Sequence, residues 1–366
     1  MGIFIAGTSV LFLFTVLEGF LIQLIRKEKT RWDIIITDLN AGHILLWVLR
    51  GLFLLAYDLV SKKYSLHLFD GFSPILLFAI GYVFWDFCFY WSHRSHHSFK
   101  PLWAVHSVHH QSEYFTMAMG IRNGYLQALT EFPFFLPMAI LGISVEEFVV
   151  VSSVYYVLQV YNHNHLVNKQ GFLEYFMMTP SNHRVHHGIN SEYLNKNHGA
   201  SFVIWDKIFG TYQHELDYVK PVFGLLEQNQ SLNPVHTNLN PLLNLLGFKS
   251  FNNRTQIKLI NQYFIGFAGA VLFLLLLVYV QIEKQWLFYD KSVLFLMIFS
   301  GTLVQGLICA GERWAYLLWP LYCLVVIINY QSFLLSLDSK YFFFSLWGMV
   351  ISAIWSLVLF LKNKNS

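Results

Sequence analysis

The chain has 366 residues, of which 55% are hydrophobic, 18% aromatic and only 12% charged. Soluble domains carry roughly 25% charged residues, so the charged share here is about half the usual one. Disorder and nucleic-acid binding both need far more charge, and a formal net charge of +3 is too small to indicate a polyanionic partner. Cys88, Cys309 and Cys323 lie in apolar runs, which argues against a disulfide framework. The composition is that of an integral membrane protein.

Several apolar runs are long enough to cross a bilayer, which takes roughly 17–25 residues. Glu18, Arg50 and Asp86 lie inside or near the ends of such runs. The paired runs between residues 125 and 161 also fit an embedded helical hairpin. The runs cover residues 3–24, 41–60, 72–91, 125–142, 144–161, 263–281, 292–310, 315–335 and 341–361.

The loops indicate an orientation in the membrane. The loop after the first run is basic, with the sequence RKEKTR at residues 26–31. The positive-inside rule places such a loop in the cytoplasm. Counting spans from there puts residues 93–122 and 162–261 on the same side, together with the C-terminal tail. Every histidine cluster then falls on the cytoplasmic face.

Most of the 16 histidines fall into three clusters. The first is WSHRSHHSFKPLWAVHSVHHQSE, the second YNHNHL and the third TPSNHRVHHGINSEYLNKNHG. The clusters hold His93, His96, His97, His106, His109 and His110, then His163 and His165, and finally His183, His186, His187 and His198.

The spacing within the clusters is typical of metal ligands on helices. Residues three and four apart share one helix face, which pairs His93 with His97. The HxxHH pattern places three imidazoles on one stripe in 106–110 and again in 183–187. Each stripe can present two or more nitrogens to a common metal at about 2.0–2.1 Å. The isolated histidines are expected to be ordinary structural residues: His43, His67, His214 and His236.

Eight or nine candidate histidines exceed what one ion can use, because a structural zinc takes four ligands and a catalytic zinc three plus water. Two metals are therefore expected. Imidazole suits zinc, copper, iron and nickel alike, so spacing alone does not name the ion.

We predict an all-α polytopic membrane protein with about 7–9 transmembrane helices and a cytosolic histidine-rich cap that holds a dinuclear metal site. N-terminal transmembrane helices take up residues 1–92. The histidine-rich catalytic region covers 93–261, with the embedded apolar hairpin near 125–161. Residues 262–366 form C-terminal transmembrane helices of unknown role.

The array HxxxH, HxxHH, HxxHH in a polytopic membrane protein resembles the fatty acid hydroxylase/sterol desaturase superfamily. Within it, the chain is most similar to the alkylglycerol monooxygenase group and its bacterial sterol-desaturase-like relatives. The resemblance covers residues 35–235 and is carried by DFCFYWSHRSHH (86–97), LWAVHSVHHQSE (102–113), LEYFMMTPSNHRVHHGIN (173–190), IWDKIFGTY (204–212) and VFGLLEQNQSLNP (222–234).

This resemblance implies a non-haem di-iron centre that uses dioxygen to hydroxylate a lipid alkyl chain. Four matching polar residues are implied to hydrogen-bond the outer nitrogens of ligand imidazoles, with a salt bridge or helix-end contact as the alternative: Asp86, Arg94, Glu113 and Arg122. The implied ligands are His93, His97, His106, His109, His110, His163, His183, His186 and His187.

The sequence departs from the subgroup's pattern at several positions. Ser98 stands where the subgroup has an acidic residue. The second cluster reads H-N-H, so either His163 or His165 can be the ligand, and His163 aligns with the family position. His198 replaces a tyrosine and is either an additional ligand or a pocket residue. His96 is an extra histidine outside the register of the HxxxH pair.

Other readings of the same pattern remain open. A lipid or sterol desaturase would use the same iron core. A membrane metal transporter or a non-catalytic zinc protein would also need histidines, although transporters place ionisable groups within their spans. The resemblance further implies a lipid from the bilayer, dioxygen and a separate electron donor, such as a reduced tetrahydropterin or a reductase. No nicotinamide or flavin fingerprint occurs in the chain. The expected location is the inner membrane of a bacterium or the endoplasmic reticulum of a eukaryote.

Overall fold

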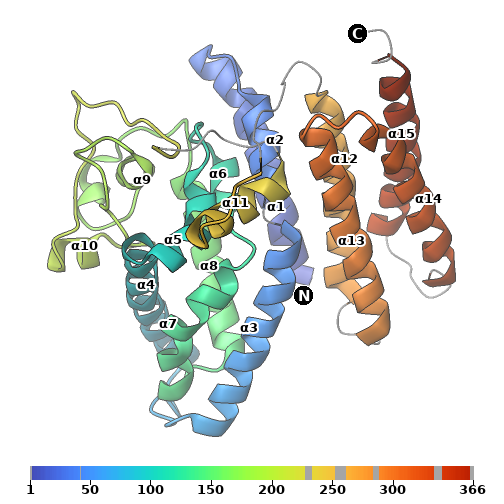
Figure 1. Cartoon of the computed structure of the whole chain (residues 1–366). Helices are drawn as coiled ribbons and strands as arrows, with labels where there is room; N and C mark the ends of the chain where they lie inside the picture. The colour runs from blue at the N-terminus through green and yellow to red at the C-terminus, as the bar shows by residue number, and fades with distance from the viewer. Residues whose placement is uncertain are drawn as a thin grey trace.

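The computed structural model describes residues 2–41, 43–226, 233–251, 261–282, 288–333 and 340–362. Within these ranges the regular elements are helices, apart from one isolated antiparallel bridge between Met177 and Phe202 (Figure 1). A π-helical turn η1 (Ile22–Arg26) and a 3₁₀ turn η2 (Gly171–Tyr175) accompany the α-helices. The α-helices are α1 (Gly2–Leu21), α2 (Trp32–Asn40), α3 (His43–Tyr64), α4 (Pro74–Ser98), α5 (Lys100–His110), α6 (Met117–Ile121), α7 (Gln127–Leu141), α8 (Val145–Asn162), α9 (Pro180–His187), α10 (Ile204–Ile208), α11 (Pro234–Leu245), α12 (Gln262–Ile282), α13 (Phe288–Cys309), α14 (Ala315–Phe333) and α15 (Lys340–Lys362).

Within the described residues, four helices are long and apolar enough to cross a membrane: α4, α12, α13 and α15. The expected 7–9 spans are therefore not confirmed. The run at 125–142 yields α7, whose 15 residues extend only about 22 Å against a hydrocarbon core of about 30 Å. Helix α8 begins with two glutamates, Glu146 and Glu147, inside the run at 144–161. The side chains of residues 1–9 and 42–48, which belong to two further runs, lie outside the described part of the chain.

Aromatic contacts hold α4, α7 and α8 together. The ring of Trp85 on α4 stacks on Tyr155 of α8 with 4.0 Å between centroids, and Tyr155 stacks on Tyr82 at 4.3 Å. Phe135 of α7 lies 5.0 Å from the ring of Trp85. Such pairs contribute about 0.5–1.5 kcal/mol each beyond their buried area. Since α4 carries His93 and α8 ends just before His163, this packing sets the distance between their histidines.

A buried carboxylate anchors α1 to the histidine-rich region. Glu18 accepts hydrogen bonds from the backbone N–H groups of Met117 and His165, each at 2.7 Å. Both donors lie close to predicted site residues, at the start of α6 and just after α8. The first apolar helix is thus attached directly to the segments that surround the histidines.

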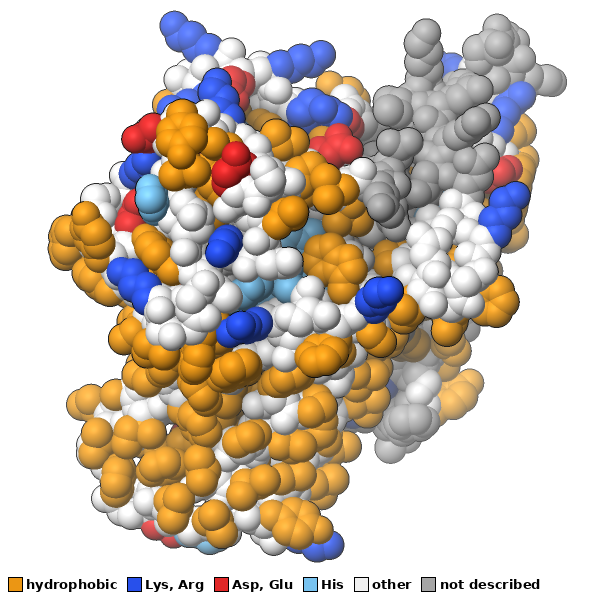
Figure 2. All heavy atoms as spheres, turned by 60° about the vertical axis from the view of Figure 1, so that its left-hand side comes forward, with side chains coloured by type: hydrophobic (Ala, Val, Ile, Leu, Met, Phe, Trp, Pro, Cys, Tyr) orange, Lys and Arg blue, Asp and Glu red, His pale blue; other side chains and the backbone are white. Residues whose placement is uncertain are grey.

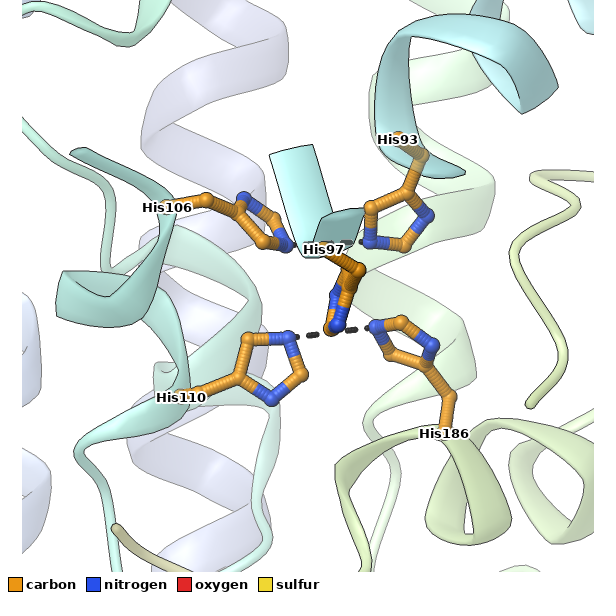
Figure 3. A group of neighbouring side chains, drawn as sticks. All are labelled: His93, His97, His106, His110 and His186. Atoms are coloured by element: carbon orange, nitrogen blue, oxygen red, sulfur yellow. Dashed lines mark hydrogen bonds between the residues drawn. The ribbon is translucent and has the colours of Figure 1, made fainter. Parts of the chain in front are cut away.

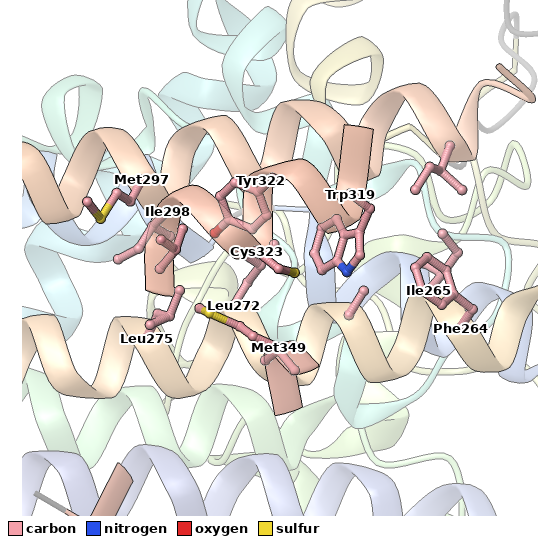
Figure 4. Close-up of a cluster of buried hydrophobic side chains, with 14 of the residues drawn as sticks. Phe264, Ile265, Leu272, Leu275, Met297, Ile298, Trp319, Tyr322, Cys323 and Met349 are labelled. Atoms are coloured by element: carbon pink, nitrogen blue, oxygen red, sulfur yellow. The ribbon is translucent and has the colours of Figure 1, made fainter. Parts of the chain in front are cut away.

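Helices α12–α15 pack around a second hydrophobic core, shown in Figure 4. At its centre, the indole Nε1 of Trp319 on α14 donates to Ser352 Oγ of α15 at 3.0 Å. In Figure 1 these helices stand together on the side of the molecule away from α9 and α10. They meet the rest of the chain where α12 crosses α2. A Cβ atom on Gly269 would lie 2.1 Å from Asn40 Oδ1, so any larger residue there would force the Asn40 side chain to move.

The division into segments at residues 92 and 261 stays a prediction. The structure does locate the histidine clusters on α4, α5, α8, α9 and the turns that follow them. None of the clusters lies on the C-terminal helices α12–α15.

Candidate metal centre

Five histidines from three helices point toward one another and form the first group (Figure 3). Each offers a ring nitrogen, and these atoms all lie within 4.8 Å of one another. The Nε2 atoms of His93 and His106 are 3.0 Å apart, and those of His110 and His186 are 3.2 Å apart. The group consists of His93 and His97 on α4, His106 and His110 on α5, and His186 on α9.

Four buried histidines form the second group: His109, His163, His183 and His187. His163 lies at its centre, with its Nε2 atom 3.0 Å from those of His183 and His187 and 3.3 Å from that of His109. The two groups are adjacent, since the rings of His110 and His187 stack with centroids 4.3 Å apart. The arrangement provides two neighbouring sets of imidazole nitrogens.

Each HxxHH stripe places two of its histidines in one group, as its spacing predicts, and the third histidine in the other group. In α5, His106 and His110 face the first group and His109 faces the second. In α9, His186 faces the first group, and the other two histidines of its stripe face the second. The reason is that α5 and α9 lie between the groups, so adjacent residues on one helix point to opposite sides.

Backbone carbonyls hold the outer nitrogens of several rings. The Nδ1 atom of His109 donates to the carbonyl oxygen of Arg122 at 2.8 Å, and that of His163 to Gln159 at 2.7 Å. In the first group, His93 Nδ1 donates to the carbonyl of His198 at 2.9 Å. Similarly, His186 Nδ1 donates to Lys196 at 3.0 Å. A neutral imidazole that donates through Nδ1 carries its lone pair on Nε2. These bonds therefore aim the lone pairs inward.

The arrangement of the Nε2 lone pairs indicates that a cation fits between the rings. His109 and His163 both donate through Nδ1, so their Nε2 lone pairs face each other at 3.3 Å with no proton between them. Such a contact is repulsive unless a cation accepts both lone pairs. A metal ion about 2.0–2.1 Å from each nitrogen leaves neighbouring ligand nitrogens about 2.9–3.4 Å apart, which is the spacing found here. The donor set fits a metal ion in each group.

The histidines stay neutral well below physiological pH. Burial lowers the pKa of His109 to about 4. For His106, burial and then the charge of neighbouring imidazoles hold the pKa well below its usual range, and the same holds for His187. Metal ligands must be neutral imidazoles, so this environment favours metal over protons.

A buried ion pair supports the second group through Arg122. Its guanidinium donates to Asp38 Oδ1 at 2.7 Å, to Gln111 Oε1 at 2.8 Å and to the carbonyl of Val108 at 2.6 Å. Both charged side chains are fully buried. The backbone carbonyl of the same arginine holds His109, so the pair fixes a histidine of the second group. Asp38 was not identified from the sequence, because it lies in a helix far from the histidine motifs.

The other predicted polar residues lie farther from the rings. Asp86 accepts hydrogen bonds from the backbone N–H of Ser201 and from Trp205 Nε1, at 2.8 and 2.9 Å. Arg94 donates to the hydroxyl of Tyr90 at 3.0 Å. Glu113 is exposed, and in the described part of the chain it makes no hydrogen bond to a histidine of either group. Of these three residues, Asp86 helps to position the loop that carries His198.

The three additional candidate histidines lie outside both groups. His96 uses its two ring nitrogens for the carbonyl of Ser92 and for Thr130 Oγ1. His165 contacts the carbonyl of Phe115 and Glu28. His198 is buried with its ring 5.0 Å from that of His97, and its backbone carbonyl holds His93.

The isolated histidines also lie apart from the two groups. His67 pairs with Asp70, His214 is exposed and His236 stacks on Phe251. The side chain of His43 lies outside the described part of the chain.

Asp206 on α10 orders the loop that holds His93. Its carboxylate accepts hydrogen bonds from the N–H groups of His198 and Gly199 at 2.7 and 2.9 Å, and from Thr211 Oγ1 at 2.7 Å. A Cβ on Gly199 would lie 2.2 Å from the carbonyl oxygen of Phe202, so the loop is tightly packed. Sequence reasoning did not single out Asp206, although it lies in the quoted motif IWDKIFGTY.

Arg184 fixes α9 from the outside. It donates to both carboxylate oxygens of Glu215, at 2.8–3.1 Å, and to the carbonyl of Val167 at 2.8 Å. The arginine stands within the third histidine motif, between His183 and His186. The position of Arg184 within this motif was the sequence signal that it helps to hold α9 in place.

A cavity of about 320 Å³ reaches the histidines from the surface. Figure 2 shows histidine side chains inside a hollow of the polar upper part of the molecule. Histidines of both groups line the cavity: His97, His110, His186 and His187. Its other walls are largely apolar and include Trp103, Ile189, Leu194, Leu225 and Leu226.

We expect Asp206→Asn to destabilise the protein by about 1–3 kcal/mol, because the amide NH₂ would face a buried N–H donor and leave it unsatisfied. Thermal unfolding of the full chain in detergent measures the change. The matched control is Asp217→Asn, which alters an exposed carboxylate paired with Lys169 and should leave the unfolding temperature nearly unchanged. Equal unfolding temperatures for the two variants would contradict the role of Asp206.

Acidification should destabilise the metal-depleted protein. The pKa of His109 is about 4 in the folded state, against an ordinary value of 6.5, so between these values the unfolded chain binds more protons. The contribution of neutral His109 to the free energy of unfolding is fully present above pH 6.5 and is lost as the pH falls toward 4. His109 alone accounts for about 2 kcal/mol at about pH 5. Unfolding temperatures at about pH 7.5 and about pH 5 check this, and an unchanged or higher value in acid would contradict it.

Comparison with known proteins agrees with the histidine pattern. Residues 78–211 match the family model for fatty acid hydroxylase, and all nine histidines of the two groups lie within this segment. Human alkylglycerol monooxygenase is 32% identical over 222 residues, which make up 60% of this chain and 49% of the human protein.

Two other relatives extend the comparison. Alkylglycerol monooxygenase of Danio rerio is 39% identical over 140 residues, 38% of this chain and 31% of the relative. The ornithine lipid hydroxylase OlsE of Rhizobium tropici is 27% identical over 137 residues, 37% of this chain and 41% of the relative. The matches thus span about half the length of these relatives or less, and no solved structure matches. The resemblance expected from the motifs is confirmed: residues 78–211 match the fatty acid hydroxylase family model, and the relatives are two alkylglycerol monooxygenases and an ornithine lipid hydroxylase.

Proposed function

We propose that the chain is a membrane-bound, non-haem di-iron oxidoreductase that uses dioxygen to hydroxylate a lipid alkyl chain. The observation that carries the proposal is the pair of adjacent all-histidine groups with inward-facing Nε2 atoms. The names of the relatives, alkylglycerol monooxygenase and ornithine lipid hydroxylase, support hydroxylation of a lipid.

The proposed ligands follow the two groups. One ion takes nitrogens from His93, His97, His106, His110 and His186, and the other from His109, His163, His183 and His187. His96 and His165 are not assigned as ligands, because their ring nitrogens bond elsewhere. Asp86, Arg94 and Arg122 act as positioning residues. Glu113 is exposed, so its proposed role is contact with the substrate or a partner at the surface.

Iron is the proposed metal because of the reaction. Imidazole binds zinc, copper, iron and nickel, so the ligands do not decide the identity. Zinc has no redox chemistry, however, and insertion of an oxygen atom from dioxygen into a C–H bond is an oxidation. When bound, the iron pair would supply the dioxygen activation that no side chain of the protein can provide.

The residues of the cavity would bind and orient the substrate. Trp103, Leu225 and Leu226 offer an apolar wall beside His110 and His187, which suits an alkyl chain. An alkyl chain in this cavity would displace water from the histidines, and exclusion of water prevents side reactions of a reactive oxidant. The carbonyls behind the rings keep the donor nitrogens in place during the reaction.

The finer assignments rest on the resemblance. The proposed substrate is an alkyl chain, with a carbon beside an ether oxygen as the narrower choice. The proposed electron donor is a reduced tetrahydropterin or a separate reductase. The basic loop at residues 26–31 supports a cytoplasmic position of the histidines, in the inner membrane of a bacterium or the endoplasmic reticulum of a eukaryote.

The test uses the purified full chain in lipid nanodiscs with iron, an ether lipid, a reduced pterin and ¹⁸O₂. We expect one ¹⁸O atom in the lipid product, with any aldehyde reduced at once by borohydride to prevent exchange with water. His183→Ala should abolish incorporation, and His165→Ala should retain it, because His165 lies outside both groups.

Other products would contradict the proposal. A lipid that loses two hydrogens and gains no ¹⁸O would identify a desaturase. Uptake of ⁵⁵Fe or ⁶⁵Zn into proteoliposomes, without oxidation of the ether lipid by dioxygen in the presence of the reduced pterin or a reductase, would identify a transporter.

A further inference from the structure

Five apolar side chains are exposed on two short elements of the histidine-rich region. Phe172 and Tyr175 of η2 are 71% and 72% exposed, and Ile208 of α10 is 61% exposed. Phe176 and Ile204 are exposed beside them. These five residues form the η2–α10 patch. Large aromatic and aliphatic side chains gathered in this way mark a surface that something covers.

The two elements form one continuous surface. The backbone N–H of Val203 donates to the carbonyl of Phe176 at 3.1 Å, and that of Met178 to Ser201 at 2.7 Å. Lys207 of α10 bonds the carbonyl of Tyr175, and its ammonium lies 5.6 Å from the centre of that ring. The patch therefore holds its shape through bonds between η2 and α10.

The patch lies beside the exposed side of α4, a candidate membrane span. Val83, Phe87 and Trp91 follow one another at four-residue intervals on the outer face of α4, and Val83 and Trp91 are exposed. The ring of Trp205 lies 5.0 Å from that of Phe87, and the ring of Phe209 lies 4.9 Å from that of Trp91. Helix α10 and the residue that follows it thus pack along the C-terminal half of α4.

We propose that the η2–α10 patch is a membrane-interfacial surface that inserts at the boundary between lipid headgroups and acyl chains. Its apolar side chains continue the outer face of α4, while the ammonium of Lys207 lies at headgroup level, as amphipathic cations do. Figure 2 shows the same order on this face: hydrophobic side chains cover the lower part, and Lys and Arg gather along its upper margin. Aromatic residues such as Tyr175 suit this depth.

The surface is joined to the candidate metal centre. Asp206 stands in α10 between Ile204 and Ile208, and its carboxylate holds the N–H groups of His198 and Gly199. The carbonyl of His198 in turn accepts from His93. Lipid contact at α10 therefore supports the loop that orients a histidine of the first group. The inference concerns how the protein sits in the bilayer and does not depend on the reaction.

The test measures the depth of nitroxide labels on the full chain in nanodiscs of phosphatidylcholine and phosphatidylglycerol. Phe172→Cys and Ile208→Cys place the labels on the patch, and Tyr218→Cys is the matched control, since Tyr218 is 83% exposed outside the patch. The native cysteines Cys88, Cys309 and Cys323 are buried, so labelling is directed to the new sites. Collision rates with apolar dioxygen and with a water-soluble nickel complex report the depth.

At both patch positions we expect the ratio of dioxygen to nickel collisions to be several-fold higher than at Tyr218→Cys. Equal ratios at the three positions would overturn the proposal, because the patch would then face water. Low collision rates with both reagents at the patch would also overturn it, since a second copy or another protein would then cover these residues. An unchanged metal content in each labelled variant shows that the fold is intact.

Discussion

The structure depends on nine imidazoles, eight of them buried and that of His97 half-buried, whose donor atoms face one another. Neutral rings that donate outward through Nδ1 direct their lone pairs inward, as His109 and His163 do at 3.3 Å. Protons do not relieve this contact near neutral pH, because burial holds the pKa of His109 at about 4. Cations that accept the lone pairs would relieve it, and they would join α4, α5, α8 and α9 at one place. The repulsion explains why so much of the surrounding structure serves to hold rings in position.

That support comes mainly from groups that are not histidines. Backbone carbonyls orient several of the rings, and buried charged residues hold the segments that carry these carbonyls. The ion pair of Arg122 with Asp38 does so for the second group, and Asp206 does so for the first. Aromatic packing between α4 and α8 fixes the helices themselves. Substitution of a supporting residue would therefore displace a donor nitrogen that this residue does not itself contact. Loss of such an outer contact typically lowers metal affinity or activity by about 10–100-fold.

Sequence patterns predicted the parts of this arrangement that follow from local geometry. The i, i+4 spacing of His93 and His97 and the two HxxHH stripes identified eight of the nine histidines that the structure gathers into the two groups. The ninth, His163, was identified by its match to the family position. The division of each stripe was not predictable, because it depends on how α5 and α9 lie between the groups. The roles of the His198 carbonyl and the Asp38 side chain were not predictable from the sequence either, because they depend on tertiary contacts. Hydropathy also counted α7 and α8 as spans, but α7 is short and α8 has two glutamates in its first turn, so the described residues do not confirm the expected number of spans.

The most direct test of the account is elemental analysis of the full chain, purified without chelators from iron-supplemented cells. We expect about two iron atoms per chain, one for each histidine group. A single ion per chain, or no stoichiometric metal, would contradict the dinuclear centre. Two zinc ions that iron does not displace would keep both binding sites and contradict the oxygenase.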